Sequence, residues 1–202
     1  MGMSEEPLTL EVPRWVWPLV VLALLFTAWA ALYIYLGPLA TGPVVAAAIV
    51  AFAFWMATTY RQPRARRVLP GYIVLLIVLV LQGMEQWAFG YAGRIAEQFP
   101  QLFAPPVVWS AELQLGVFTL GTATLLLFAA VGIFFHHPLG NYGAWLACSL
   151  AVVGGLSLYG AQALVSGLAY MPGMAMGLVA IVLGLLVGTQ LLRIGSEEEV
   201  MA

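Results

Sequence analysis

The sequence contains no lysine and no aspartate, and its single cysteine is Cys148. Without lysine, the chain cannot form the Schiff base on which retinal and pyridoxal phosphate proteins depend. One cysteine cannot form an internal disulfide, and it cannot supply a thiolate metal site. Charged residues make up only 8% of the chain, against roughly 25% in soluble domains. The net charge of −2 gives no sign of a nucleic-acid partner.

Hydrophobic residues, in contrast, make up 63% of the chain. So few charged side chains could not cover the surface of a soluble domain, so lipid must be the main solvent. We therefore expect an all-α helical bundle in the membrane, with one membrane domain over residues 1–202. Glu5, Glu6 and Glu11 lie where a secretion signal needs positive charge, so we expect the first apolar segment to remain in the mature protein.

Six segments are apolar enough to cross a bilayer, which takes about 20 residues of helix. We place them at 14–37, 43–60, 71–93, 111–135, 142–167 and 172–193. Gly37-Pro38 and Gly42-Pro43 predict a tight turn between the first two segments. Residues 61–70 predict a polar linker before the third segment.

Arginine predicts the orientation of these spans. Four of the seven arginines lie between the second and third spans, which places that loop in the cytoplasm. With six spans, Arg14 and Arg193 fall on the same side, and Arg94 is the only arginine on the outer side. We expect a multi-pass protein of the cell (inner) membrane with both termini in the cytoplasm.

Small residues recur at helical spacing along the last span, and the fifth span carries a matching stripe. Such stripes let helix backbones approach closely in lipid. We therefore expect spans five and six to form a tight hairpin, although the same face could instead join two copies of the chain. The residues are Gly173, Gly177, Gly184 and Gly188 in span six, and Ala147, Ala151 and Gly155 in span five.

Glu85 is the clearest polar residue inside a predicted span, and a carboxyl group there is costly unless it is protonated, paired or hydrated. It lies about 22 Å from the cytoplasmic end of the third span, at about 1.5 Å per residue. Other polar residues fall at a similar depth in spans three to five, and we see nothing comparable in the inner half. The candidate ligand-binding residues are Gln82, Glu85, Gln86, Glu112, Tyr159 and Gln162.

Two interpretations of this group remain open. In the structural one, Glu85 is a buried, protonated side chain that hydrogen-bonds Tyr159 or Gln162 and locks the bundle. In the functional one, the group lines an outward-facing pocket for a ligand, an ion or a proton. Glu85 and Glu112 would then be the candidate acid and base.

His136 and His137 are adjacent at the predicted cytoplasmic end of span four. Neighbouring side chains on a helix point about 100° apart, so these two cannot easily share a metal ion. We assign no metal site. Either histidine could be the axial ligand of a haem or chlorophyll, and the simpler interpretation is that both face lipid headgroups. The cofactor is unknown.

The stretch Gln82-Gly-Met-Glu85-Gln86, followed by Trp87 and Phe99-Pro100, resembles the motif of the HXXEE family of small membrane proteins. Tyr170-Met-Pro172-Gly173 is similar to the family's Tyr-x-Pro-Gly at its last span. The resemblance covers about two-thirds of the chain. The motif's histidine and its second glutamate are both glutamine here, and the family implies an architecture and a site rather than a reaction.

Three functions fit these features. The first is a non-catalytic accessory or ligand-binding subunit of a larger membrane complex, with other membrane subunits and a small apolar ligand as partners. The second is a membrane-embedded isomerase or cyclase that acts on a lipid-soluble substrate through Glu85. The third is a small proton-coupled transporter. The lack of a reactive constellation favours the first, and leaves it uncertain whether the chain is an enzyme at all.

Overall fold

The computed structural model describes residues 13, 15–59, 65–98, 111–164 and 170–199. Side chains are described within these ranges except at 35–40, 65, 92, 96, 98, 111, 112, 114, 164 and 195–199. The elements are α1 (Val16–Phe54), a π-helix η1 (Trp55–Thr59), a 3-10 helix η2 (Ala65–Val68), α2 (Leu69–Ala88), α3 (Tyr91–Gln98), α4 (Ala111–Phe134), α5 (Pro138–Leu164) and α6 (Met174–Glu199). The described part of the chain is helical and contains no strand.

Six stretches of helix are long and apolar enough to cross a membrane. They are Val16–Ile34, Thr41–Thr59, Arg66–Ala88, Leu115–Phe134, Pro138–Ala163 and Met174–Ile194. Large apolar side chains remain exposed along them, and Leu120, Phe128 and Phe135 are each 71% exposed. Such a surface is stable in hydrocarbon and not in water. The all-α membrane bundle of six spans predicted from the sequence is confirmed.

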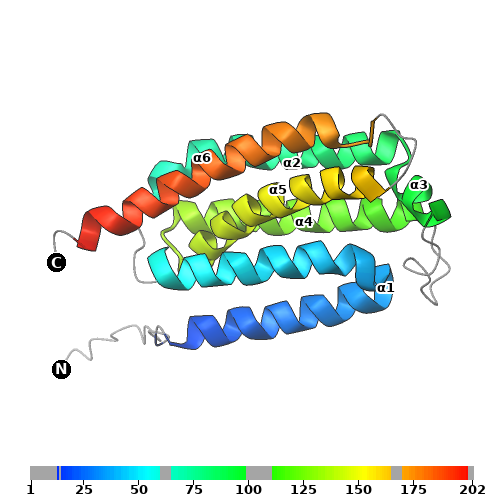
Figure 1. Cartoon of the computed structure of the whole chain (residues 1–202). Coiled ribbons are helices and arrows are strands. Elements are labelled where there is room, and N and C mark those ends of the chain that lie inside the picture. Colours follow the sequence, from blue (N-terminus) through cyan, green and yellow to red (C-terminus); the bar gives the residue numbers. More distant parts are fainter. Residues whose placement is uncertain (1–12, 14, 60–64, 99–110, 165–169, 200–202) are drawn as a thin grey trace, which may run out of the picture.

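The first two spans both belong to α1. A straight helix of 39 residues would measure about 58 Å, nearly twice the roughly 30 Å hydrocarbon core. Instead, α1 bends sharply and its second half returns beside the first (Figure 1). The bend falls between the two spans of α1, after Ile34 and before Thr41, in a stretch that contains Gly37-Pro38. Proline lacks the N–H of a regular helical turn, and glycine adds freedom. The predicted turn is therefore a bend within continuous helix.

α5 lies at the centre of the bundle, where it packs against α1, α4 and α6, while α2 packs against α4 and α6 (Figure 1). The buried core includes Trp55 of η1, Leu126 of α4 and Trp145 of α5. Tyr72 of α2 is fully buried, and its hydroxyl donates to the Leu126 carbonyl of α4 at 2.6 Å. This bond satisfies a polar group that would otherwise be stranded in the core.

Several helix boundaries differ from the prediction, and α6, expected over 172–193, extends to Glu199. The third span was expected to run to residue 93, but α2 ends at Ala88 and Gly90 turns the chain at a φ of 64°. A short helix, α3, follows and folds back at the end of the bundle. The fifth span was expected from residue 142, but α5 starts at Pro138. Proline is favourable in the first helical position, where its missing N–H costs no bond.

The corner between α4 and α5 is closed by backbone hydrogen bonds. His136 adopts a φ of 58°, and the His137 N–H donates to the Gly132 carbonyl at 2.8 Å. The His136 N–H donates to the Ile133 carbonyl at 3.2 Å, which completes a Schellman cap. Nδ1 of His137 accepts from the Leu139 N–H at 3.2 Å and caps the start of α5.

The small residues of α5 and α6 lie against each other. A Cβ added at Gly184 would lie 2.9 Å from Cβ of Ala151 and 3.1 Å from the Cys148 carbonyl oxygen. A Cβ at Gly155 would lie 3.0 Å from the Gly177 carbonyl oxygen. Gly188 faces the Trp145 ring at 3.6 Å. These helices therefore approach at backbone distance within one chain, which leaves no room there for a second copy.

Replacing Gly140 by alanine should destabilise the protein by about 2–3 kcal/mol, because its Cβ would overlap the backbone of Gly132 and Ile133 in the α4–α5 corner. Thermal unfolding of the purified protein in detergent measures this loss. Gly154→Ala is the matched control in the same helix, since no atom lies within 4 Å of its Cβ position. Equal melting temperatures for the two variants would contradict the packing described for this corner.

Candidate functional site

The side chains of the predicted polar group meet at the first turn of α6 and at the residues just before it. Glu85 extends from the last turn of α2 and is half-buried. Its Oε1 accepts a hydrogen bond from the Tyr170 hydroxyl. Its Oε2 accepts from the backbone N–H of Met176 at 3.3 Å. Both carboxyl oxygens are thus engaged by the chain itself.

Met176 is the third residue of α6, and this explains why a carboxyl group lies there. The first four N–H groups of a helix have no acceptor within the helix, and in hydrocarbon each must find one elsewhere. Glu85 of α2 supplies that acceptor from a neighbouring helix. The positive end of the α6 dipole favours the same placement.

The two glutamines beside Glu85 lie against glycines of the same segment. Gln82 is 7% exposed, and a Cβ at Gly177 would lie 3.4 Å from its Nε2. A Cβ at Gly173 would lie 2.7 Å from Cγ of Gln86. Gly173 also has a φ of 93°, which only glycine adopts readily. Gly173 therefore makes room for a polar side chain of α2. Gly177 lies between α2 and α5, because a Cβ there would also lie 3.3 Å from Cδ1 of Leu158. Gly184 and Gly188 face α5.

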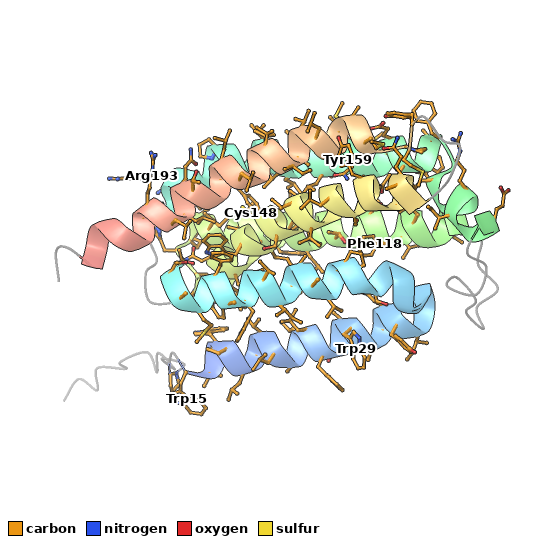
Figure 2. All side chains as sticks on the ribbon, in the orientation of Figure 1. Trp15, Trp29, Phe118, Cys148, Tyr159 and Arg193 are labelled. Atoms are coloured by element: carbon orange, nitrogen blue, oxygen red, sulfur yellow. The ribbon has the colours of Figure 1, made fainter. Side chains whose placement is uncertain are left out.

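Tyr159 joins the group from α5, because its hydroxyl donates to the Met174 carbonyl at 3.2 Å. Figure 2 shows Tyr159 toward the end of the bundle that carries α3, and Arg193 near the opposite end. Gln162 lies about one turn further along α5 and is half-buried. The structural interpretation named Tyr159 or Gln162 as the partner of Glu85. The hydrogen bonds described for its two oxygens come from Tyr170 and Met176, and the Tyr159 hydroxyl donates to Met174.

Glu112, the other candidate carboxyl group, belongs to the first turn of α4. Its side chain lies outside the described residues. Among the described residues, no group of three or more His, Cys, Asp and Glu side chains is placed to hold a metal ion.

α3 covers the same end of the bundle with a small apolar cluster. Ile95 of α3 is 3% exposed and packs against the fully buried Met171, with Tyr91 and Met174 beside them. Burial raises the pKa of the Tyr91 phenol above its usual value. The segment from Met171 to Met174 is therefore held from one side by apolar packing and from the other by Glu85 and Gln86.

The histidines take part in the α4–α5 corner. Because Nδ1 of His137 accepts from the Leu139 N–H, only its Nε2 is left for any other ligand. Its ring also meets the Trp17 ring edge-on, with centroids 4.6 Å apart. His136 lies at the left-handed position of the Schellman cap and is exposed.

Sequence reasoning missed a second polar group, at the end of the bundle opposite α3. Nδ2 of Asn141 donates to the Thr59 carbonyl at 3.2 Å, and Nε1 of Trp145 donates to Oγ1 of Thr59 at 3.1 Å. The π-helical turn that ends at Thr59 directs this carbonyl toward α5. The signal was present, because Asn141 is the only asparagine in the sequence. The expectation that polar residues mark only the outer half was wrong.

The Glu85–Tyr170 bond predicts a measurable coupling. Glu85→Leu and Tyr170→Phe should each lower stability, and the double variant should lose less than the sum. We expect a coupling free energy of about 1 kcal/mol from a double-mutant cycle of unfolding in detergent. Glu97→Leu with Tyr170→Phe is the control pair, since Glu97 is exposed on α3. Strict additivity for Glu85 and Tyr170 would show that the bond contributes nothing.

Comparisons with known proteins give no match. No protein-family model, curated protein or solved structure matches the chain. Its function is therefore inferred from its own residues.

Proposed function

We propose that the chain is a non-catalytic integral membrane protein that serves as an accessory or ligand-binding subunit of a larger membrane complex. One observation carries the proposal. Both oxygens of Glu85, the candidate acid or base, accept hydrogen bonds from residues that open α6. A catalytic acid or base must instead reach the reacting atom of a substrate directly or through one water.

The neighbours of Glu85 support the same proposal. Gln82 and Gln86 lie against Gly177 and Gly173, so both side chains pack against the start of α6. Tyr159 donates to a backbone carbonyl of α6. Each candidate ligand-binding side chain with a described contact thus helps to place the start of α6, as a structural role requires.

The proposal includes a location in the cell (inner) membrane with both termini in the cytoplasm. The distribution of arginine supports it. Arg66, Arg67 and Arg193 lie at the end of the bundle where α1 starts and α6 ends, and Arg94 lies at the other end (Figure 1).

The resemblance to the HXXEE family stays a prediction. The two segments that carry it are the end of α2 and the residues before α6. They lie together in this fold, where Glu85 of the first accepts from Tyr170 of the second.

The test compares Glu85→Gln with Glu85→Leu in the native membrane. The tagged protein is extracted in mild detergent and analysed by native gel, by mass spectrometry and by an absorbance scan. We expect an assembly with stoichiometric membrane subunits, unchanged in Glu85→Gln, since the amide oxygen still accepts the Met176 N–H. Glu85→Leu should lower the yield, because that N–H loses its acceptor.

Two outcomes would contradict the proposal. One is a chain that is monomeric and without ligand in the native membrane. The other is a Glu85→Gln variant that assembles in normal amounts while the process it serves stops, because this points to proton chemistry at Glu85. His136→Leu and His137→Leu are the controls for any visible absorbance, which the wild type would have to show first.

A further inference from the structure

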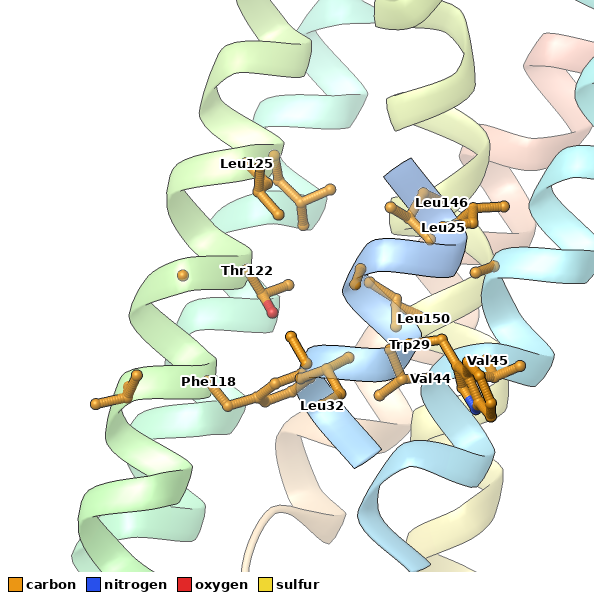
Figure 3. Close-up of a pocket in the computed structure, with 16 residues that line it drawn as sticks. Leu25, Trp29, Leu32, Val44, Val45, Phe118, Thr122, Leu125, Leu146 and Leu150 are labelled. Carbon is orange, nitrogen blue, oxygen red and sulfur yellow. The ribbon is translucent and has the colours of Figure 1, made fainter. Parts of the chain in front are cut away.

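A cavity of about 440 Å³ lies between α1, α4 and α5, away from the Glu85 group. Both halves of α1 line it, through residues such as Leu25 and Leu32 in the first half and Val45 in the second. Figure 3 shows Phe118, Thr122 and Leu125 on α4 facing these residues. The volume falls within the range of roughly 300–1,000 Å³ that is usual for small-molecule sites.

The walls are almost entirely hydrocarbon. Apart from the Thr122 hydroxyl and the Trp29 indole N–H, the side chains that line the cavity are aliphatic or phenyl groups. Every lining residue belongs to a membrane-spanning stretch, so the medium that reaches the cavity is lipid. A ligand with several polar groups would find almost no hydrogen-bond partners inside.

The depth of the cavity matches one leaflet. Along α4 the lining runs from Val117 to Leu126, or about 14 Å at about 1.5 Å per residue. Val117 lies two residues inside the span Leu115–Phe134. The cavity therefore extends from one face of the membrane to its middle, and half of the roughly 30 Å hydrocarbon core is the depth of one acyl chain.

The first half of α1 separates the cavity from the surrounding lipid. Val21 is its only buried residue among the described side chains, while Phe26 is 68% exposed and Trp29 is 41% exposed. This half of the helix is thus the outermost wall, and it packs on the core through Trp17, Val21 and Leu25. A chain can enter from the surrounding bilayer without passing through water.

We propose that this cavity binds one acyl chain of a bilayer phospholipid, in the leaflet that faces the bend of α1. The chain lies along α4 and fills the space that its side chains leave, while the headgroup stays at the membrane surface. This explains why the walls need no polar partner for the ligand. The site is independent of the role of Glu85.

The test uses two glycines of α4 that both have open space at the Cβ position. Gly121 lines the cavity, Gly116 does not, and no atom lies within 4 Å of either Cβ position. Gly121→Phe should fill part of the cavity, and Gly116→Phe adds the same side chain outside it. Ala28→Phe fills the cavity from α1 instead of α4. The test therefore does not depend on whether the Gly121→Phe variant folds.

The full-length protein is reconstituted in nanodiscs of phosphatidylcholine that carries a diazirine midway along one acyl chain. After photolysis, mass spectrometry maps the label, and native mass spectrometry weighs the lipid retained in detergent. We expect label on residues 25–32 and 117–126, with one retained phospholipid, in the wild type and Gly116→Phe. Both features should be lost in Gly121→Phe and Ala28→Phe.

Equal labelling in Gly121→Phe and Gly116→Phe would overturn the proposal, because the label would then report only general contact with lipid. Retention of a free fatty acid or an isoprenoid in place of the phospholipid would also overturn it. A dimer cross-linked through α1 and α4 would show that a second copy covers the cavity, and would overturn it as well.

Discussion

The start of α6 must satisfy its backbone N–H groups at the end of a membrane span, and much of one end of the bundle is arranged around that requirement. In hydrocarbon, each N–H without an acceptor costs several kcal/mol. Glu85 reaches across from α2 and accepts from the Met176 N–H, while Tyr170 donates to its other oxygen. A carboxyl group placed inside a span by itself suggests chemistry, but here both of its oxygens accept hydrogen bonds from the chain.

The rest of that end follows from this contact. Gly173 and Gly177 lack side chains where Gln86 and Gln82 pass, and Tyr159 bonds the first carbonyl of α6. α3 then covers Met171 with Ile95. At the opposite end, Asn141 and Trp145 tie Thr59 to α5 in a similar way. In both places a side chain of one helix satisfies a polar group of another, which fixes how the helices pack.

The six spans could be predicted because a long apolar run carries its own signal. The ends of the helices were harder, because they depend on neighbours: α2 stops before Gly90, and α5 begins at Pro138 in a corner closed by backbone bonds. The convergence of Gln82, Glu85 and Tyr159 was partly visible from depth alone. The actual partner of Glu85 was not, because a backbone N–H such as that of Met176 exists at every residue except proline and gives no sequence signal.

The helices pack more closely on one side of the bundle than on the other. α5 is buried at the centre, where small residues bring α6 to backbone distance. The first half of α1 packs on the core through Trp17, Val21 and Leu25, and it borders the large apolar cavity. α5 and α6 are closely packed, whereas the first half of α1 lies at the outside of the bundle. This arrangement allows an apolar chain from the bilayer to occupy the cavity, and it needs no reactive group.

The most direct test of the account is the distance between the Glu85 carboxyl carbon and the Met176 amide nitrogen. Solid-state NMR can measure it in lipid, with ¹³C on glutamate side-chain carboxyl groups and ¹⁵N on methionine amides. Glu85→Gln and Met176→Leu assign the signal by removing it. We predict a strong dipolar coupling, as expected from the 3.3 Å between Oε2 and the amide nitrogen. The absence of that coupling would mean that the carboxyl group faces elsewhere, and would reopen an acid–base role for Glu85.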